Sequence, residues 1–226
     1  MGSRRCGWPL VLLYHAVVER PRGGLQIAPD LLRRQLLCIL SRGLRPVTVS
    51  EALEGRDGCV AVTFDDASAS IREVALPLLS ELGVRATAFV PTPVNGTPGL
   101  LSREDLRLLV ESGWEIGSHC VTHRPLTRLD DASLWEELAG SRASLEAELG
   151  LPCRAVSYPF GVADERVVAA ARAAGYRVGC TVFGPARLRP DRLCWPRVGV
   201  DGREPMLAFR LRASARMRAL RIAVRR

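Results

Sequence analysis

The sequence contains no lysine, so all 32 of its basic residues are arginines and the formal net charge of +8 rests entirely on Arg. Ala, Leu, Gly and Pro are abundant as well, which indicates a composition-wide bias and weakens the charge as a sign of nucleic-acid binding. Aromatic residues make up only 5% of the chain, and it has neither zinc-finger spacing nor a stacked aromatic platform. We therefore expect no nucleic-acid partner.

Paired cysteines and long apolar runs are also missing. The seven cysteines are scattered without a C-x-x-C pair, which argues against a disulfide framework and favours a reducing compartment. No run approaches the ~20 apolar residues of a membrane span. The apolar stretch from Gly7 to Val18 is similar to a signal peptide, but Tyr14 and His15 interrupt it and no small-residue cleavage site follows. We interpret this stretch as a buried strand and predict a cytoplasmic location.

Short apolar, β-branched runs alternate with longer helical patterns along the chain. Strands are expected at 9–13, 45–49, 60–64, 86–90, 114–117, 155–158, 176–182 and 193–198. Helices are expected at 30–40, 71–82 with a kink at Pro77, 102–113, 132–149 and 164–174, and several of them close on Gly. Repeated strand–helix units of this length predict an α/β fold with a parallel sheet, either closed into a barrel or open and doubly wound.

The chain length favours one domain. With 226 residues, 47% of them hydrophobic, the sequence fits a single sizeable core and is too short for a comfortable second one. Residues 1–206 are assigned to this domain and residues 207–226 to a basic C-terminal tail. The tail holds seven Arg and no acidic residue.

Two adjacent carboxylates and two imidazoles form the most informative pattern. Asp65 and Asp66 come directly after the expected strand at 60–64, while His119 and His123 follow a later strand at a spacing of i and i+4. One carboxylate and two imidazoles make a normal three-ligand set for a catalytic divalent metal, which leaves the second carboxylate as a base. The alternative is that the Asp pair caps a helix and both His lie on the surface. Only three His occur in the chain, and two of them have a ligand spacing.

Other polar residues follow further strands of the expected sheet. His15 comes after the first strand, and Tyr158-Pro159-Phe160-Gly161 comes after the strand at 155–158. In both open and closed parallel α/β folds, chemistry gathers at the carboxyl ends of the strands. A lone His after an apolar strand is otherwise most often a satisfied core residue.

Three motifs in order carry a family resemblance. The sequence at 63–67, T-F-D-D-A, is similar to a T-F-D-D-G motif, and G-S-H-C-V-T-H at 117–123 is similar to an H-x-x-x-H metal motif. S-Y-P-F-G at 157–161 is similar to a groove-wall motif. Together these segments resemble the polysaccharide deacetylase family, the NodB-homology domain of carbohydrate esterase family 4. The Tyr-His pair at 14–15 most resembles the branch of poly-N-acetylglucosamine deacetylases.

The resemblance implies a fold and a reaction. The fold would be a single-domain, distorted (β/α) barrel with parallel strands. The reaction would be removal of N-acetyl groups from an N-acetylated saccharide, with release of acetate. Asp66, His119 and His123 would hold one divalent metal ion, with zinc as the first candidate for this ligand set, and Asp65 would be the base.

The resemblance also implies roles for residues outside the ligand set. His15 would be the general acid that protonates the departing nitrogen. Tyr158, Pro159 and Phe160 would bind substrate, and a backbone N–H near Tyr158 or the metal itself would stabilise the oxyanion.

Two departures from the family pattern bear on the site. Ala67 replaces the Gly after the Asp pair, at a position where a left-handed backbone would favour glycine. The Arg that often starts the groove-wall motif is absent next to Tyr158. Arg154 or Arg197 could orient the base instead, and we favour Arg197, although either could be an ordinary surface residue.

Alternatives to this function and to the role of the tail stay open. The chain could hydrolyse a small N-acyl compound, or bind saccharides without catalysis. In the tail, Arg residues interleave with apolar ones, a pattern that allows peripheral contact with the inner face of a membrane. The alternative is a solvated terminal helix.

Overall fold

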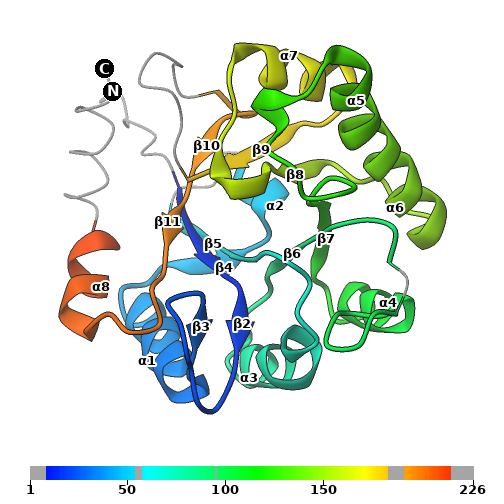
Figure 1. Cartoon of the computed structure of the whole chain (residues 1–226). Helices are drawn as coiled ribbons and strands as arrows, with labels where there is room; N and C mark the ends of the chain where they lie inside the picture. The colour runs from blue at the N-terminus through cyan, green and yellow to red at the C-terminus, as the bar shows by residue number, and fades with distance from the viewer. Residues whose placement is uncertain (1–8, 54–57, 95, 183–190, 215–226) are drawn as a thin grey trace, which may run out of the picture.

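The computed structural model describes residues 9–53, 58–94, 96–182 and 191–214 (Figure 1). Its strands are β1 (Leu10–Tyr14), β2 (Ala16–Val17), β3 (Gln26–Ile27), β4 (Arg45–Val47), β5 (Cys59–Phe64), β6 (Thr87–Val90), β7 (Glu115–Ser118), β8 (Ala155–Ser157), β9 (Val178–Thr181), β10 (Trp195–Pro196) and β11 (Val198–Gly199). Its helices are α1 (Pro29–Leu40), α2 (Val49–Leu53), α3 (Leu76–Glu81), α4 (Arg103–Glu111), α5 (Asp131–Trp135), α6 (Ser141–Leu149), α7 (Glu165–Ala173) and α8 (Met206–Arg212). Every strand and helix expected from the sequence is present, several with shorter bounds.

The main sheet is parallel and closes on itself. Its strands run in the order β10-β9-β8-β7-β6-β5-β1-β11, with β4 paired to β5. β10 pairs with β9, and β11 pairs with β1. Because β10 and β11 belong to one short segment, 195–199, that segment joins the two edges of the sheet. The predicted distorted (β/α) barrel is confirmed, and the strand expected at 193–198 is divided at Arg197.

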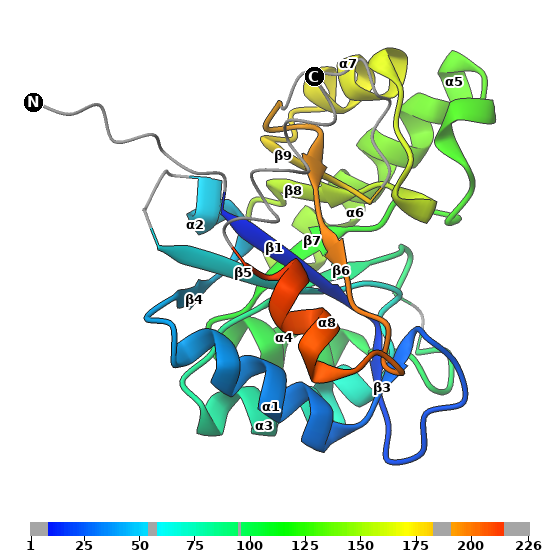
Figure 2. The ribbon, with the colours of Figure 1, turned by 90° about the vertical axis from the view of Figure 1, so that its left-hand side faces the viewer.

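Alternation along the strands separates two apolar clusters. Leu10, Leu12 and Tyr14 of β1 belong to the large cluster beneath the helices, whereas Val11 belongs to a smaller cluster inside the barrel. Such a division follows from the two-residue period of a strand. All residues of β1 and β5 are buried, as expected for parallel strands covered on both faces. Figures 1 and 2 show α1, α3 and α4 on one side of the strands and α5, α6 and α7 on the other.

The amino-terminal end of the barrel is closed by α2. Val49 and Ala52 of this helix belong to the inner cluster. The sequence pattern placed a strand at 45–49, but β4 ends at Val47 and a helix follows. Thr48 and Glu51 explain the change, because the Glu51 carboxylate accepts from the Thr48 N–H at 2.9 Å and the Thr48 hydroxyl accepts from the Glu51 N–H at 3.4 Å. This reciprocal pair is a capping box, which starts a helix.

Two expected helices contain π-helical turns. The helix at 71–82 begins with a π turn at Ile71–Ala75, and α3 follows with Pro77 in its first turn, where a missing N–H costs least. The helix at 132–149 consists of α5, a π turn at Glu136–Gly140 and α6.

The last described residues pack onto the barrel rather than leaving it. Phe209 of α8 is fully buried, and α8 contacts α1, beside which it lies in Figure 2. The predicted boundary after residue 206 falls within the first turn of α8 (Met206–Arg212). Residues 215–226, with the remaining Arg of the predicted membrane-binding tail, lie outside the described residues. None of the helices in the described part of the chain is long and apolar enough to cross a membrane.

Candidate active site

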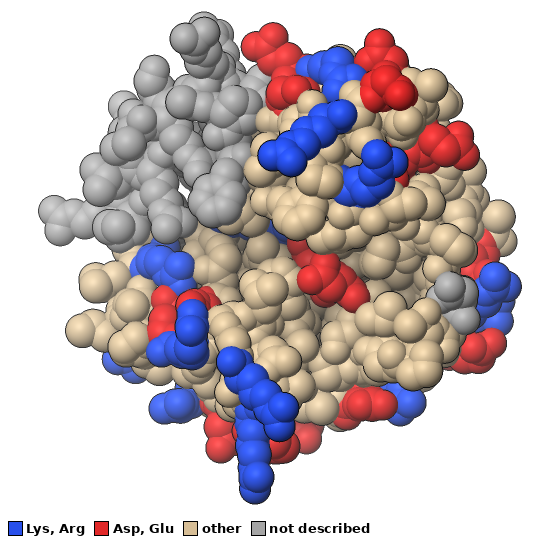
Figure 3. All heavy atoms as spheres, in the orientation of Figure 1, with Lys and Arg blue, Asp and Glu red and all other residues tan. Residues whose placement is uncertain are grey.

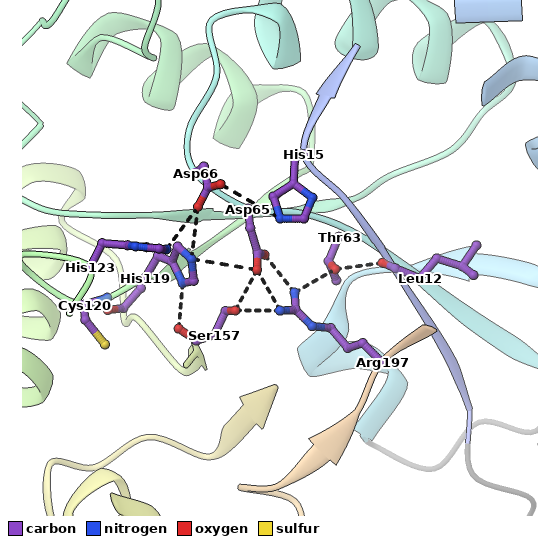
Figure 4. Close-up of polar contacts among 11 residues, drawn as sticks. Leu12, His15, Thr63, Asp65, Asp66, His119, Cys120, His123, Ser157 and Arg197 are labelled. Carbon is purple, nitrogen blue, oxygen red and sulfur yellow. Dashed lines mark hydrogen bonds and ion pairs between the residues drawn. The ribbon is translucent and has the colours of Figure 1, made fainter. Parts of the chain in front are cut away.

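The carboxyl ends of the strands bring Asp66 and two imidazoles together. Asp66 follows β5, and His119 follows β7. His119 Nε2 lies 3.2 Å from Asp66 Oδ1, and His123 Nε2 lies 3.4 Å from the same oxygen (Figure 4). One ligand atom from each of these residues lies within 4.8 Å of the other two. The predicted ligand set is thus assembled at one point.

Hydrogen bonding prepares His119 to bind a metal. Its Nδ1 lies 2.7 Å from the carbonyl oxygen of Ser157, so this nitrogen carries the proton and donates. The Nε2 lone pair is then directed at Asp66, which is the tautomer that a metal-binding imidazole requires. Burial acts to raise the pKa of Asp66, but the neighbouring imidazoles of His119 and His123 hold it well below its ordinary value. An anionic carboxylate and a neutral imidazole fit a divalent cation.

Asp65 turns away from the ligands and toward Arg197. The Arg197 guanidinium donates to both oxygens of Asp65 at 2.7 Å, and the Ser157 hydroxyl donates to Oδ2 at 2.9 Å. Asp65 and Arg197 are each only 3% exposed. Burial acts to raise the pKa of Asp65, but the Arg197 charge and hydrogen bonds lower it below its ordinary value. Asp65 is therefore held ionised, in one orientation, beside the ligand cluster.

Arg197 reaches Asp65 from the segment that closes the barrel. Its backbone N–H donates to Thr181 O at 2.8 Å, and its side chain extends inward above the Phe89 ring, 5.5 Å from the ring centre. Gly117 makes room for that ring, since a Cβ there would lie 2.5 Å from it. Arg154, the alternative considered from the sequence, is exposed just before β8, at the opposite end of that strand from Ser157.

The two residues after Asp65 have a left-handed backbone. The φ angles of Asp66 and Ala67 are 66° and 51°. The resemblance to the T-F-D-D-G motif suggested that Ala67 replaces a Gly at such a position, and its φ angle agrees. Alanine in this conformation costs roughly 1–2 kcal/mol.

His15 faces the same cluster from the end of β1. Its Nε2 lies 3.9 Å from Asp66 Oδ2, and its Nδ1 is buried without a hydrogen-bond partner among the described residues. Burial lowers the pKa of His15, while Asp65 and Asp66 act to raise it. A lower pKa makes the protonated imidazole a stronger acid.

A cavity of about 570 Å³ opens over these groups. Its lining includes all six predicted catalytic and metal-binding residues, namely His15, Asp65, Asp66, His119, His123 and Arg197. Figure 3 shows acidic residues near the middle of this face, surrounded mainly by uncharged ones. Phe160 also lines the cavity, is 57% exposed, and lies edge-on to His123 with 4.9 Å between ring centres.

The predicted substrate-binding role is wrong for the side chains of Tyr158 and Pro159. Both are buried, and the Tyr158 hydroxyl donates to Leu193 O at 2.8 Å in the outer core. The Tyr158 N–H donates to Cys180 O and is not free for an oxyanion. The alternation of β8 explains the error: Ser157 faces the site, so the next residue faces away. Phe160 alone of the three presents its side chain to the cavity.

Sequence reasoning assigned no role to Ser157 or Thr63. The Ser157 hydroxyl accepts from Arg197 at 2.7 Å while donating to Asp65. Thr63 accepts from Arg197 at 3.2 Å and donates to Leu12 O at 2.8 Å. One feature of the sequence could have pointed to Ser157. It occupies the first position of the groove-wall motif, where the family often has an Arg.

A polysaccharide deacetylase family model matches residues 52–179, more than half of the chain. The chain belongs to the polysaccharide deacetylase family. The match includes both Asp and both His of the H-x-x-x-H motif, whereas His15 and Arg197 lie outside it.

Three relatives of this family member agree with the assignment. YxkH of Bacillus subtilis is 25% identical over 178 residues, 76% of this chain and 63% of that protein. The poly-β-1,6-N-acetyl-D-glucosamine N-deacetylase of Staphylococcus aureus is 24% identical over 136 residues, 53% of this chain and 46% of that protein. The structure of the Streptococcus pyogenes deacetylase PplD in complex with acetate has a TM-score of 0.78 and covers 86% of this chain and 93% of that one. At 24% identity, this last likeness shows the fold. The chain spans less than two thirds of the length of the two sequence relatives.

Proposed function

We propose that the chain is a metal-dependent hydrolase that removes N-acetyl groups from an N-acetylated saccharide and releases acetate. The observation that carries this proposal is the division of labour between Asp65 and Asp66. The Asp66 carboxylate points at the two imidazoles, while that of Asp65 is held by Arg197. A binding module has no need of this second carboxylate, whereas hydrolysis requires a base.

Asp66, His119 and His123 would hold the divalent ion, with zinc as the first candidate. When bound, such an ion supplies Lewis-acid polarisation of the amide carbonyl and makes water more acidic. The protein supplies the rest. Asp65 accepts a proton as water adds to the acetamido carbon, and Arg197 keeps its carboxylate in place during the transfer.

Amine departure requires a proton on nitrogen. His15 is placed on the other side of Asp66 from His123 and donates this proton as the carbon–nitrogen bond breaks. The products are acetate, which contains the oxygen of the water, and a free amine, which receives the proton. Phe160 offers an exposed aromatic face at the rim, which suits the apolar face of a sugar ring.

Substrate class separates this proposal from its alternatives. Acetate release is to be measured from N-acetylglucosamine oligomers and from small N-acyl amides. Preference for the oligomers supports the proposal. Turnover of the small amides alone would favour the amidohydrolase alternative, and turnover of neither would favour a saccharide-binding relative.

Elemental analysis tests the ligand set separately. The purified chain should contain close to one divalent ion, and both His119→Ala and His123→Ala should reduce this content sharply. Unchanged metal content in these variants would remove the ligand assignment even if acetate were released.

The location of the protein belongs to the proposal as well. We place it in the cytoplasm, peripheral at the inner membrane face through residues 215–226 and the exposed side of α8. Phe209 is buried, so α8 offers only Leu207 and Leu211 as exposed apolar residues. Electrostatic attachment is worth ~1 kcal/mol per basic residue and is screened by salt. Sedimentation with anionic vesicles at low salt, compared with a chain ending at Ser214, tests it, and equal behaviour of the two chains would contradict it.

A further inference from the structure

The loop that joins the two imidazoles has an uncommon backbone conformation. Cys120 and His123 have φ angles of 66° and 55°, and neither is glycine. Such residues cost of order 1–3 kcal/mol each and persist only where neighbouring groups impose them. The loop conformation determines where the His123 ring stands, 4.7 Å from the His119 ring between centres.

One buried carboxylate, that of Glu137, holds the middle of this loop. Its Oε2 accepts from the N–H of Val121 at 2.8 Å and from the N–H of Thr122 at 3.0 Å. Its Oε1 accepts from the Thr122 hydroxyl. Glu137 is only 4% exposed, so these bonds are made away from competing water. Two consecutive amides gripped by one oxygen fix the turn that ends at His123.

Glu137 comes from the π turn that separates α5 from α6. Turns of this kind are rare and concentrate at functional sites. Ser141, directly after the turn, accepts from the Ser118 hydroxyl at 2.8 Å, and Ser118 in turn accepts from the Cys120 N–H at 3.0 Å. The same helical region therefore holds the start of the loop through Ser141 and its middle through Glu137.

We propose that Glu137 is a positioning residue for the metal site. By gripping Val121 and Thr122, it holds the His123 imidazole where it shares an ion with Asp66. Glu137 itself does not line the cavity. This inference rests on the proposed metal-dependent function. Partners that orient metal ligands in this way typically contribute 10- to 100-fold to metal affinity.

Glu115 provides a matched control at the opposite end of the barrel. Its carboxylate also accepts from one backbone N–H, that of Ser50 at 3.0 Å, and from the hydroxyls of Ser50 and Thr87. Its replacement by Gln perturbs a similar hydrogen-bonded network, but one that does not contact Asp66, His119 or His123.

Zn²⁺ affinity of the full chain is to be measured by competition with a chromophoric chelator, with thermal unfolding of each metal-free form alongside. Glu137→Ala should weaken Zn²⁺ binding by about 10- to 100-fold. Glu137→Gln keeps the side-chain length and one acceptor oxygen, so it should lose less Zn²⁺ affinity than Glu137→Ala. Glu115→Gln should bind Zn²⁺ as the wild type does, even where its unfolding temperature changes.

Folded Glu137 variants that bind Zn²⁺ as tightly as the wild type would overturn the inference while leaving the metal site intact. If Glu137→Ala does not fold, Glu137→Gln decides by the same criterion. An equal loss in Glu115→Gln would also overturn it, since affinity would then follow stability. A wild-type chain that binds neither Zn²⁺, Co²⁺ nor Ni²⁺ would contradict the proposed function together with this inference.

Discussion

The barrel holds a carboxylate at each of its ends, Asp65 fully buried and Glu115 partly buried, and the two differ in their partners. At the open end, Asp65 is gripped by Arg197 and faces the cavity. At the end closed by α2, the donors to Glu115 among the described residues are hydroxyls and a backbone amide. Burial acts to raise the pKa of both carboxyl groups. Arg197 nevertheless brings the pKa of Asp65 below its ordinary value, whereas the pKa of Glu115 stays above its ordinary value. A nearby cation therefore decides in which direction the pKa of a carboxylate departs from its ordinary value.

Backbone strain also differs between the open and the closed end of the barrel. All left-handed residues other than glycine in the described ranges follow strands at the open end: Asp66, Ala67, Cys120, His123 and Phe160. The closed end relies on regular capping and apolar packing by α2. Strain gathers where side chains must be aimed and is absent where the structure only seals the barrel.

The largest effect is expected from His15 at the open end. His15→Ala should slow acetate release by about 10²- to 10⁴-fold, the usual contribution of a general acid. Metal content and thermal stability should stay close to those of the wild type, because no ligand is removed. Glu115→Gln, at the closed end, should keep its rate. Normal turnover by His15→Ala on an amide substrate would return His15 to the role of a core histidine.

Arg197→Met removes the cation that distinguishes the open end. It should destabilise the fold at neutral pH by about 3–5 kcal/mol, because Asp65 is left buried and unpaired. In the wild type, the lowered pKa of Asp65 stabilises the fold at pH values above its ordinary pKa of about 3.9. This stabilisation is lost as the pH falls through the lower pKa of the folded state. Without Arg197 the pKa of Asp65 rises, so the stability difference between the two chains should shrink in acid. Urea unfolding at several pH values measures this, and equal stability of both chains at neutral pH would contradict it.

The closed end should show the opposite pH dependence. The raised pKa of Glu115 stabilises the fold fully at pH values below its ordinary pKa of about 4.3. This stabilisation is lost as the pH rises through the higher pKa of the folded state. Glu115→Gln removes this titration and should flatten the stability curve in that window. An unchanged slope would mean that Glu115 ionises in the folded state as it does in the unfolded chain.

Ala67→Gly should have the smallest effect. Relief of the left-handed alanine, worth roughly 1–2 kcal/mol, is partly offset by the greater entropy that glycine loses, about 0.5–1 kcal/mol. We expect a net gain in unfolding free energy of no more than about 1 kcal/mol. Chemical denaturation measures it, and a clear loss of stability would show that the methyl group of buried Ala67 matters more than its backbone strain.

Strand-end positions were predictable from the sequence because they depend on local patterns. Apolar runs of parallel strands put the Asp pair and His119 at one edge, and the i, i+4 spacing brought in His123. The start of α2 was also readable from the Thr48-x-x-Glu51 capping box, but the β-branched run before it favoured a strand.

Contacts between distant segments could not be predicted in this way. Glu137 lies in a π turn and accepts from Val121, so it contacts the loop between His119 and His123 from a distant helical segment. Arg197 was favoured over Arg154 from its motif alone, and its two bonds to Asp65 depend on how the last segment closes the barrel. Tyr158 was assigned to the substrate because the motif suggested it, although strand alternation turns its ring into the core.

The account stands on Asp65 being the base and not a ligand. Metal content and acetate release of Asp65→Asn, measured on the same preparation beside the wild type, test this most directly. The amide keeps the shape of the side chain and leaves Asp66, His119 and His123 in place. We expect close to one ion in both chains and a loss of acetate release in the variant by at least about 10²-fold. Near-normal acetate release by Asp65→Asn, or loss of its metal, would contradict the account.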